Sequence, residues 1–231
     1  MEAKEEKKPS EKGQGSESVS MIRTLSIVAI ISGILIVGAY QWTGPTIKKN
    51  KAEFLRKAIF QTLPQIKELK IFKEEPAGIL VPLVGEEEKA TRYFAGYDAS
   101  GALVGVVVEA EGQGFQDVIR IIYAYSPEKK AIVGFKVLET KETPGLGDKI
   151  EKDPHFLENF EALDVRLDAD QKSLVHPIEV VKIGNKKDLW QIDAITGATI
   201  SSKAVGRMVN KSAGERVPVI EKNLSLLKGG S

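Results

Sequence analysis

Small and hydroxyl-bearing residues gather close to the C-terminus in a pattern that suits a bound phosphate. The run reads Asp193-Ala194-Ile195-Thr196-Gly197-Ala198-Thr199-Ile200-Ser201-Ser202-Lys203. Apolar residues at helical spacing follow it, which predicts a helix that begins near Thr199. The first turn of a helix has unpaired N–H groups and the positive end of the helix dipole, and both favour a phosphate. The geometry therefore allows a phosphate ester on Thr199, with the ammonium of Lys203 one turn along the same face.

Helix capping is the alternative explanation of these residues, because serine and threonine hydroxyls often accept hydrogen bonds from the free amides of a helix start. The motif D-x-x-T-G-A-T favours a phosphate ester over helix capping, since it resembles the flavinylation motif of covalent-FMN proteins. In those proteins the last threonine carries FMN through a phosphoester bond, and here that residue is Thr199. The resemblance also implies cofactor-binding roles at Asp193, Thr196, Gly197, Ala198, Ser201, Ser202 and Lys203.

A second segment, between Lys141 and Ile150, resembles the E-T-P-G-L-G loop of the same proteins. Its residues are Glu142, Thr143, Pro144, Gly145, Leu146 and Gly147. Proline fixes its own φ, and the two glycines lack the Cβ atoms that would hold a planar ring away from the backbone. Such a loop can offer N–H donors to a flavin edge, which would raise the flavin's potential. Taken alone, the loop is more often a tight surface turn. Together with the threonine motif, it predicts Thr143 and Leu146 at the isoalloxazine.

The I-S-S-K-A-V sequence after Thr199, together with the loop, is similar to the G subunit of the Rnf electron transport complex. The match is closer than that to a related family, the C subunit of the sodium-pumping NADH:quinone reductase. One departure is Thr140, where the family pattern has a histidine. The resemblance implies a membrane-anchored electron carrier, without turnover of its own, in an ion-translocating ferredoxin:NAD oxidoreductase. Its implied partners are membrane and iron–sulfur subunits of that complex.

The family resemblance also implies a flavin transferase that attaches FMN from FAD with magnesium. Asp193 lies six residues before Thr199. It either orients the threonine hydroxyl or recruits the ion in that step, or it forms hydrogen bonds within the strand-to-helix turn.

Three alternatives remain open from the sequence. The first is a carrier like the C subunit of a sodium-pumping NADH:quinone reductase. The second is a substrate-reducing enzyme, which would need a catalytic partner because no second domain follows Ser212. The third is a non-flavin membrane-anchored assembly module in which both motifs are turns. Flavin content separates this module from the carriers.

An uncharged stretch of 24 residues, Thr24 to Ile47, predicts one transmembrane helix at residues 21–43. As a helix the stretch would reach about 36 Å, enough for a hydrocarbon core of about 30 Å. A cleaved signal peptide is less favoured because the apolar run is long and no small-x-small site clearly follows it. Tyr40 and Trp42 suit the membrane interface, and Gly44-Pro45 predicts the end of the helix.

Orientation in the membrane is not fixed by charge, because basic residues flank the predicted span on both sides. The family resemblance implies a short cytoplasmic tail and a flavin domain on the periplasmic or outer face of the cell membrane. Residues 1–20 are mostly Glu, Lys, Ser and Gly, which predicts a disordered tail.

The remaining pattern predicts an α+β domain of antiparallel strands and helices. An amphipathic helix is expected between Pro45 and Pro64, within a connector at residues 44–75. Strands are expected at 93–97, 103–108, 118–125 and 131–138, and a hairpin of 178–183 with 189–195 is expected to lead into Thr199. The predicted FMN-binding domain covers residues 76–220, and residues 221–231 form a C-terminal tail.

Composition excludes several other classes. The chain has 231 residues, a net charge of +1 and no cysteine, which argues against a nucleic-acid surface, thiol catalysis and cysteine-ligated clusters. His155 and His176 lack ligand spacing, so no metal site is predicted. The phosphate-loop motifs G-x-G-x-x-G and G-x-x-x-x-G-K-[ST] are absent.

Overall fold

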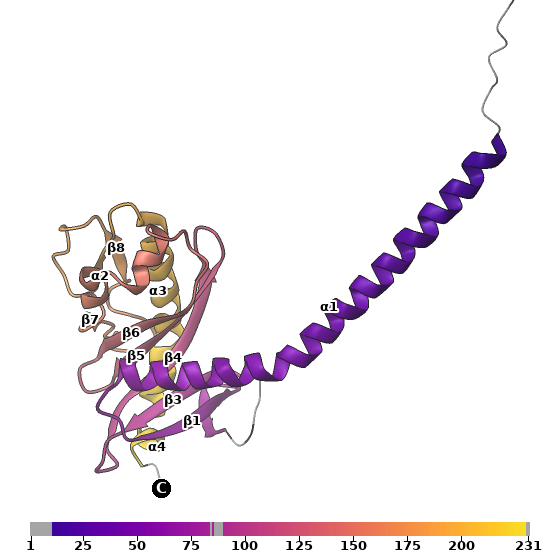
Figure 1. Ribbon diagram of the computed structural model, residues 1–231. Helices are drawn as coiled ribbons and strands as arrows, with labels where there is room; N and C mark the ends of the chain where they lie inside the picture. Colours follow the sequence, from indigo (N-terminus) through magenta and orange to yellow (C-terminus); the bar gives the residue numbers. More distant parts are fainter. Residues whose placement is uncertain (1–10, 84, 86–89, 230–231) are drawn as a thin grey trace, which may run out of the picture. The chain divides into compact units, whose positions relative to one another are not determined.

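The computed structural model describes residues 11–83, 85 and 90–229, and within it the chain forms two compact units (Figure 1). The first unit ends at Glu53 and the second begins at Phe54. One long helix, α1 (Glu11–Thr62), passes from the first unit into the second.

The first unit contains the apolar part of α1. An 18-residue window of this helix has a mean hydropathy of 2.2, and none of the window is buried. The large apolar side chains from Val19 to Val37 are each at least 50% exposed. Among the described helices, α1 alone is long and apolar enough to cross a membrane. A helix whose apolar side chains face outward on all sides is typical of a membrane span.

Two sequence predictions about this helix are wrong. The helix begins at Glu11, so residues 11–20 are helical rather than disordered, whereas residues 1–10 lie outside the described part of the chain. The helix also continues through Pro45 instead of ending there. A proline removes one backbone hydrogen bond, but the residues on both sides still propagate the helix. Just before it, the Thr43 hydroxyl donates to the Ala39 carbonyl at 2.8 Å.

A seven-stranded antiparallel sheet forms the centre of the second unit, in the order β2-β1-β3-β4-β5-β6-β7. The strands are β1 (Glu68–Glu75), β2 (Ile79–Pro82), β3 (Arg92–Tyr97), β4 (Leu103–Gln113), β5 (Val118–Ser126), β6 (Ala131–Glu139) and β7 (Leu163–Asp164). Strands β3 to β6 confirm the antiparallel strands predicted from runs of β-branched and aromatic residues. A second sheet pairs β8 (Glu179–Val181) with β9 (Gln191–Asp193).

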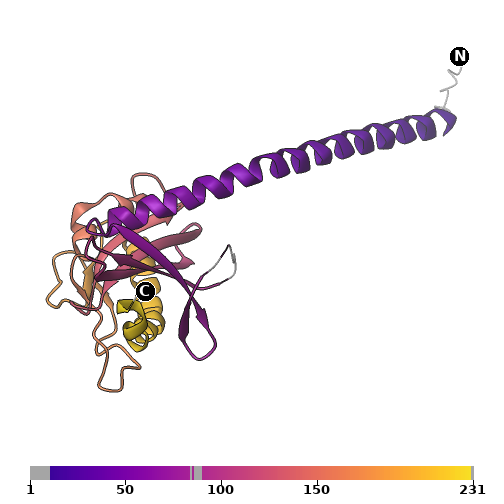
Figure 2. The ribbon, with the colours of Figure 1, turned by 90° about the horizontal axis from the view of Figure 1, so that it is seen from below.

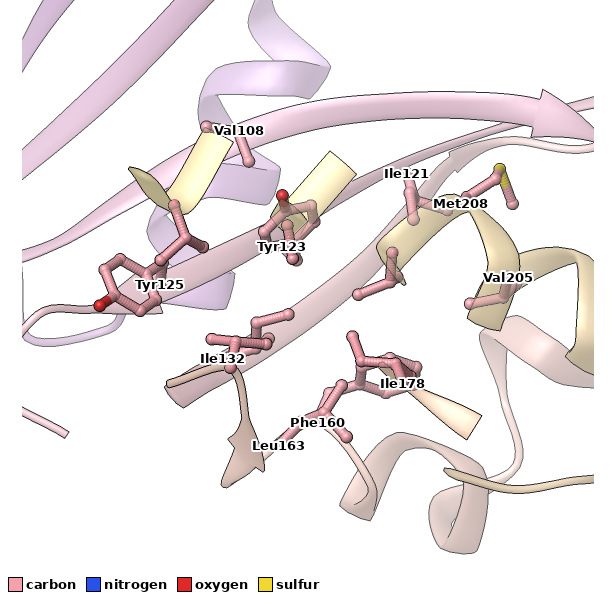
Figure 3. Close-up of a cluster of buried hydrophobic side chains, with 14 of the residues drawn as sticks. Val108, Ile121, Tyr123, Tyr125, Ile132, Phe160, Leu163, Ile178, Val205 and Met208 are labelled. Carbon is pink, nitrogen blue, oxygen red and sulfur yellow. The ribbon is translucent and has the colours of Figure 1, made fainter. Parts of the chain in front are cut away.

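The central strands are apolar on both faces because both faces are covered. On one face Tyr93, Val108 and Ile121 pack with the helix α3 (Thr199–Lys222). Figure 3 shows part of this cluster, including Val205 and Met208 of α3. On the other face, residues such as Phe94, Val107 and Ile122 pack with the end of α1, through Ala58, Ile59 and Leu63. Figure 2 gives a second view of these layers.

Tyrosine hydroxyls of strand β5 form hydrogen bonds with α3. The Tyr123 hydroxyl lies 2.9 Å from the Ser212 hydroxyl, and the Tyr125 hydroxyl donates to Glu221 at 2.6 Å. Burial raises the pKa of Tyr123 far above its ordinary value, so its hydroxyl remains a neutral hydrogen-bonding group. These contacts fix the helix whose first residue is Thr199.

The predicted hairpin before Thr199 is wrong, because β8 and β9 are parallel. The intervening loop folds back along the pair instead of turning tightly. Its amides are held by side chains of the second strand: Asp193 accepts from the Lys186 amide at 3.0 Å, and Gln191 accepts from the Lys187 amide at 2.9 Å. These bonds allow β9 to run in the same direction as β8.

The folded unit also extends beyond the predicted domain limits of 76 and 220. The end of α1 and strand β1 precede residue 76 and belong to it, and α4 (Leu224–Lys228) follows residue 220 with Leu227 buried. The two remaining helices, η1 (Gly147–Glu151) and α2 (Pro154–Glu158), lie between β6 and β7 in the chain.

Candidate functional site: the start of helix α3

Thr199 is the first residue of α3, as the sequence predicts. Its side chain is exposed, and Ala198 before it is buried and provides no side-chain cap. Among the described residues, none accepts a hydrogen bond from the amides of Thr199, Ile200 or Ser201. The first intrahelical bond runs from the Ser202 amide to the Ala198 carbonyl at 2.9 Å. The start of the helix therefore combines an accessible hydroxyl with free N–H donors.

The turn that leads into α3 is fixed by Ser202, which is fully buried. Its hydroxyl accepts from the Ile195 amide at 3.1 Å and donates to the Ala198 carbonyl at 2.9 Å. Within the turn, Thr196 is exposed and Gly197 adopts a φ of +82°, in the left-handed region that favours glycine. Ser202 thus has a structural role in the predicted motif, whereas Thr199 is left accessible.

The predicted loop 142–147 lies beside this turn. A Cβ atom on Gly197 would be 3.7 Å from Leu146 Cδ2, in van der Waals contact. Within the loop the Leu146 amide donates to the Thr143 carbonyl at 3.1 Å, Pro144 is exposed and Gly145 has a φ of +76°. The structure therefore brings together the two motifs, which are some fifty residues apart in sequence.

Glu142 joins the loop to α3 and to the turn between β4 and β5. Its carboxylate accepts from the Ser201 hydroxyl, from the Phe115 amide at 2.8 Å and from the Gln116 amide at 3.0 Å. The side-chain amide of Gln116 also donates to the Thr143 hydroxyl at 2.9 Å. Three segments thus meet at one carboxylate.

Phe115 is a residue of this site that neither sequence motif predicts. Phe115 is 61% exposed, and two nearby apolar residues are also exposed, Leu146 at 49% and Ile200 at 55%. The β4–β5 turn, the 142–147 loop and the start of α3 thus contribute one exposed apolar side chain each. The available signal was an aromatic residue directly after Gly114, in a turn between two predicted strands.

Asp193 is engaged away from the Thr199 hydroxyl. Its carboxylate accepts from the Lys186 amide at 3.0 Å, and its own amide donates to Asn159 Oδ1 at 3.1 Å. The Lys186 ammonium donates to the same Asn159 oxygen at 3.0 Å. Burial lowers the pKa of Lys186, although the charge of Asp193 opposes that shift. These contacts support the hydrogen-bonding alternative for Asp193.

A cleft of about 380 Å³ lies next to this network, lined by residues that include His155, Asn159, Lys186 and Asp193. The other histidine, His176, stacks on Trp190 with ring centroids 3.9 Å apart. Within the described ranges, no group of three or more His, Cys, Asp or Glu residues is arranged to hold a metal ion. Lys203 is exposed in the first turns of α3, four residues after Thr199.

The second unit is similar to FMN-binding domains in sequence and in fold. A family model described as an FMN-binding domain matches residues 114–214, from the β4–β5 turn into α3. The fold is that of Shewanella oneidensis NqrC, with a TM-score of 0.59 at 21% identity over 79% of this chain and 100% of that chain. The C subunit of the Na(+)-translocating NADH-quinone reductase from Parabacteroides distasonis gives a TM-score of 0.51 at 24% identity, over 67% of this chain and 78% of that one.

Sequence relatives define the family more narrowly. The chain is 32% identical to the G subunit of the ion-translocating oxidoreductase complex of Methanosarcina acetivorans, over 82% of this chain and 89% of the relative. It is 30% identical to the G subunit of the proton-translocating ferredoxin:NAD(+) oxidoreductase complex of Clostridium ljungdahlii, over 86% of this chain and 90% of the relative. The chain therefore belongs to the G subunit family of ion-translocating oxidoreductase (Rnf) complexes.

Proposed function

We propose that this chain carries FMN esterified through its phosphate to Thr199 and relays electrons within an ion-translocating ferredoxin:NAD oxidoreductase complex. The observation that carries the proposal is the exposed Thr199 at a helix start with free amides, inside an FMN-binding domain. When bound, FMN supplies one- and two-electron transfer.

The start of α3 fits the phosphate of such an ester. A phosphodiester keeps a negative charge, and the free amides of Ile200 and Ser201 together with the helix dipole stabilise charge at that position. Lys203 adds a positive charge one turn further on. Gly197 leaves one exposed position of the turn before Thr199 without a side chain.

The neighbouring surface fits a planar ring. Phe115, Leu146 and Ile200 offer exposed apolar area that a ring would cover, and the 142–147 loop offers backbone groups to its edge. Covering apolar surface stabilises a bound ligand by about 25 cal/mol per Å². A covalent link keeps the flavin on the protein between electron-transfer events. This matters on the periplasmic or outer face of the membrane, where free FMN is scarce.

The apolar helix and the ion-translocating relatives together point to a membrane-anchored protein. In the proposed arrangement α1 crosses the membrane once and the FMN-binding domain lies on the periplasmic or outer face. Its partners are other membrane and iron–sulfur subunits of the complex, membrane lipid and, during maturation, a flavin transferase. Because the chain has no cysteine, cysteine-ligated iron–sulfur clusters must be held by other subunits.

The relay is tested by rapid kinetics on the purified complex. After mixing with reduced ferredoxin, the covalent flavin of this chain should be reduced and then reoxidised by NAD at least as fast as the complex turns over. Stopped-flow absorbance of the flavin gives both rates, with NAD omitted as the control for the second step. A flavin whose reduction is slower than overall turnover would exclude it from the electron path.

The proposed orientation is tested with single cysteines, because the native chain has none to label. Lys172→Cys places a thiol at an exposed position of the FMN-binding domain, and Ser10→Cys places one before α1. In intact cells a membrane-impermeant maleimide should label the first variant and not the second, and both should react after lysis. If only Ser10→Cys were labelled in intact cells, the orientation of the protein in the membrane would be the opposite of the proposed one.

A further inference from the structure

The carboxylate of Glu142 occupies an unusual position for a charged group. The residue is only 5% exposed, and among the described residues no Lys, Arg or His forms an ion pair with it. It is instead satisfied by three donors, the Ser201 hydroxyl and the amides of Phe115 and Gln116. Burying a carboxylate is costly unless such bonds compensate for the lost water. The three bonds provide this compensation, so the position of Glu142 is fixed by protein groups from two other segments.

Two glycines make the space in which this carboxylate lies. A Cβ atom on Gly114 would be 2.5 Å from Glu142 Oε1, and one on Gly147 would be 2.7 Å from Glu142 Oε2 and 2.9 Å from Ser201 Oγ. These distances are too short for any real side chain. The lack of a side chain at Gly147 therefore leaves room for Glu142 and Ser201.

The three bonds connect the segments that carry the candidate flavin site. Ser201 lies two residues after Thr199, so its bond to Glu142 fixes the rotation of the first turn of α3 and the direction in which Thr199 points. The two amide bonds fix the β4–β5 turn and with it Phe115. Leu146 follows Glu142 by four residues in the same loop.

We infer that Glu142 is a positioning residue: it does not contact the flavin, but its three hydrogen bonds hold Thr199, Leu146 and Phe115 in the arrangement that FMN attachment and ring binding require. This inference rests on the proposed function. Its carboxylate is enclosed by protein donors, which leaves Thr199 and the exposed apolar residues to meet the cofactor.

The test measures FMN attachment to the full-length chain in detergent, with FAD, magnesium and the flavin transferase. Glu142→Ala should slow covalent incorporation by about ten- to one-hundredfold, because a displacement of about 1 Å costs on the order of one-hundredfold in a reaction that depends on orientation. Glu142→Gln retains an acceptor for the amides and gains an N–H for the Ser201 oxygen, so its rate should stay within about threefold of the native rate. Ser201→Ala should fall between the two.

Visible circular dichroism of the attached flavin provides a readout that a general loss of stability does not change. The native chain and Glu142→Gln should give the same signal, whereas Glu142→Ala should give a weaker one because the ring is less firmly held. Glu111→Ala, an exposed glutamate on β4, is the control and should match the native chain in both measurements. Ser201→Ala and Glu142→Gln decide the question if Glu142→Ala does not fold.

Native rates and native dichroism in folded Glu142→Ala, or in Ser201→Ala, would overturn the inference. Glu142→Gln as slow as Glu142→Ala would also overturn it, since hydrogen bonding would then not explain the effect. A native chain that takes up no FMN would instead refute the proposed function itself. The two failures are therefore distinguishable.

Discussion

Thr199→Ala is expected to abolish covalent flavin while leaving the fold intact. The proposed ester needs the Thr199 hydroxyl, and alanine has no atom to replace it. The fold should survive because the Thr199 side chain is exposed and makes no capping hydrogen bond. Even a typical cap contributes only about 1 kcal/mol. Intact mass of the denatured protein gives the flavin content, and thermal unfolding checks the fold.

Thr196→Ala is the matched control for this prediction, because Thr196 is an exposed threonine three residues earlier in the same turn. It should retain covalent FMN. Thr199→Ser should retain some flavin, since it keeps a hydroxyl at the same position. Covalent flavin on Thr199→Ala would place the attachment at another residue.

Gly134→Ala is expected to lower the stability of the fold. A Cβ atom at Gly134 of β6 would collide with the Thr62 carbonyl oxygen and would lie 2.7 Å from Thr62 Cγ2. Backbone at the end of α1 cannot move aside as a flexible side chain can. Overpacking of this kind costs about 1–3 kcal/mol. For a domain of this size that corresponds to a fall in melting temperature of roughly 2–12 °C.

Gly214→Ala is the control for this substitution and should have the opposite sign. Gly214 lies inside α3, and no other atom comes within 4 Å of its Cβ position. Alanine in a helix interior is about 0.5–1 kcal/mol more favourable than glycine. Near-UV circular dichroism followed during heating measures both variants. A Gly134→Ala variant as stable as the native chain would show that the end of α1 does not pack on β6 as described.

The α+β class and strands β3 to β6 could be predicted because their patterns are local, whereas β1, of eight residues, was missed within the expected connector. Runs of β-branched and aromatic residues mark β3 to β6, and hydroxyl residues before an apolar helical run mark the start of α3. The short strands could not be predicted in the same way. β7 has two residues and β8 and β9 have three each, too few for a periodic pattern.

The direction of β9 was mispredicted because long-range contacts determine it. Asn159, from the end of α2, accepts from the Asp193 amide at 3.1 Å, and Asp193 in turn holds the Lys186 amide. A sequence with Gly184-Asn185 between two apolar runs favours a hairpin when only neighbours are considered. The end of α1 was mispredicted for a local reason: Pro45 removes one backbone hydrogen bond, but the residues on both sides of it propagate the helix.

The candidate site was predicted only in part. Family resemblance supplied Thr199 and the 142–147 loop, and the structure places them side by side. It did not supply Phe115, which reaches the site through a backbone bond to Glu142. Nor did spacing reveal that Gly147 accommodates Glu142, because that depends on a contact between residues 142, 147 and 201.

The most direct test of the central claim is peptide mapping of the native, full-length chain after coexpression with an active flavin transferase. The protein is denatured and washed, and its visible spectrum and the mass of the peptide that contains Thr199 are recorded. If Thr199 carries FMN, the flavin spectrum persists after washing and the Thr199 peptide gains the mass of FMN minus one water. An unmodified Thr199 peptide with no retained flavin would contradict the claim, and both motifs would then be structural turns of a membrane-anchored assembly module.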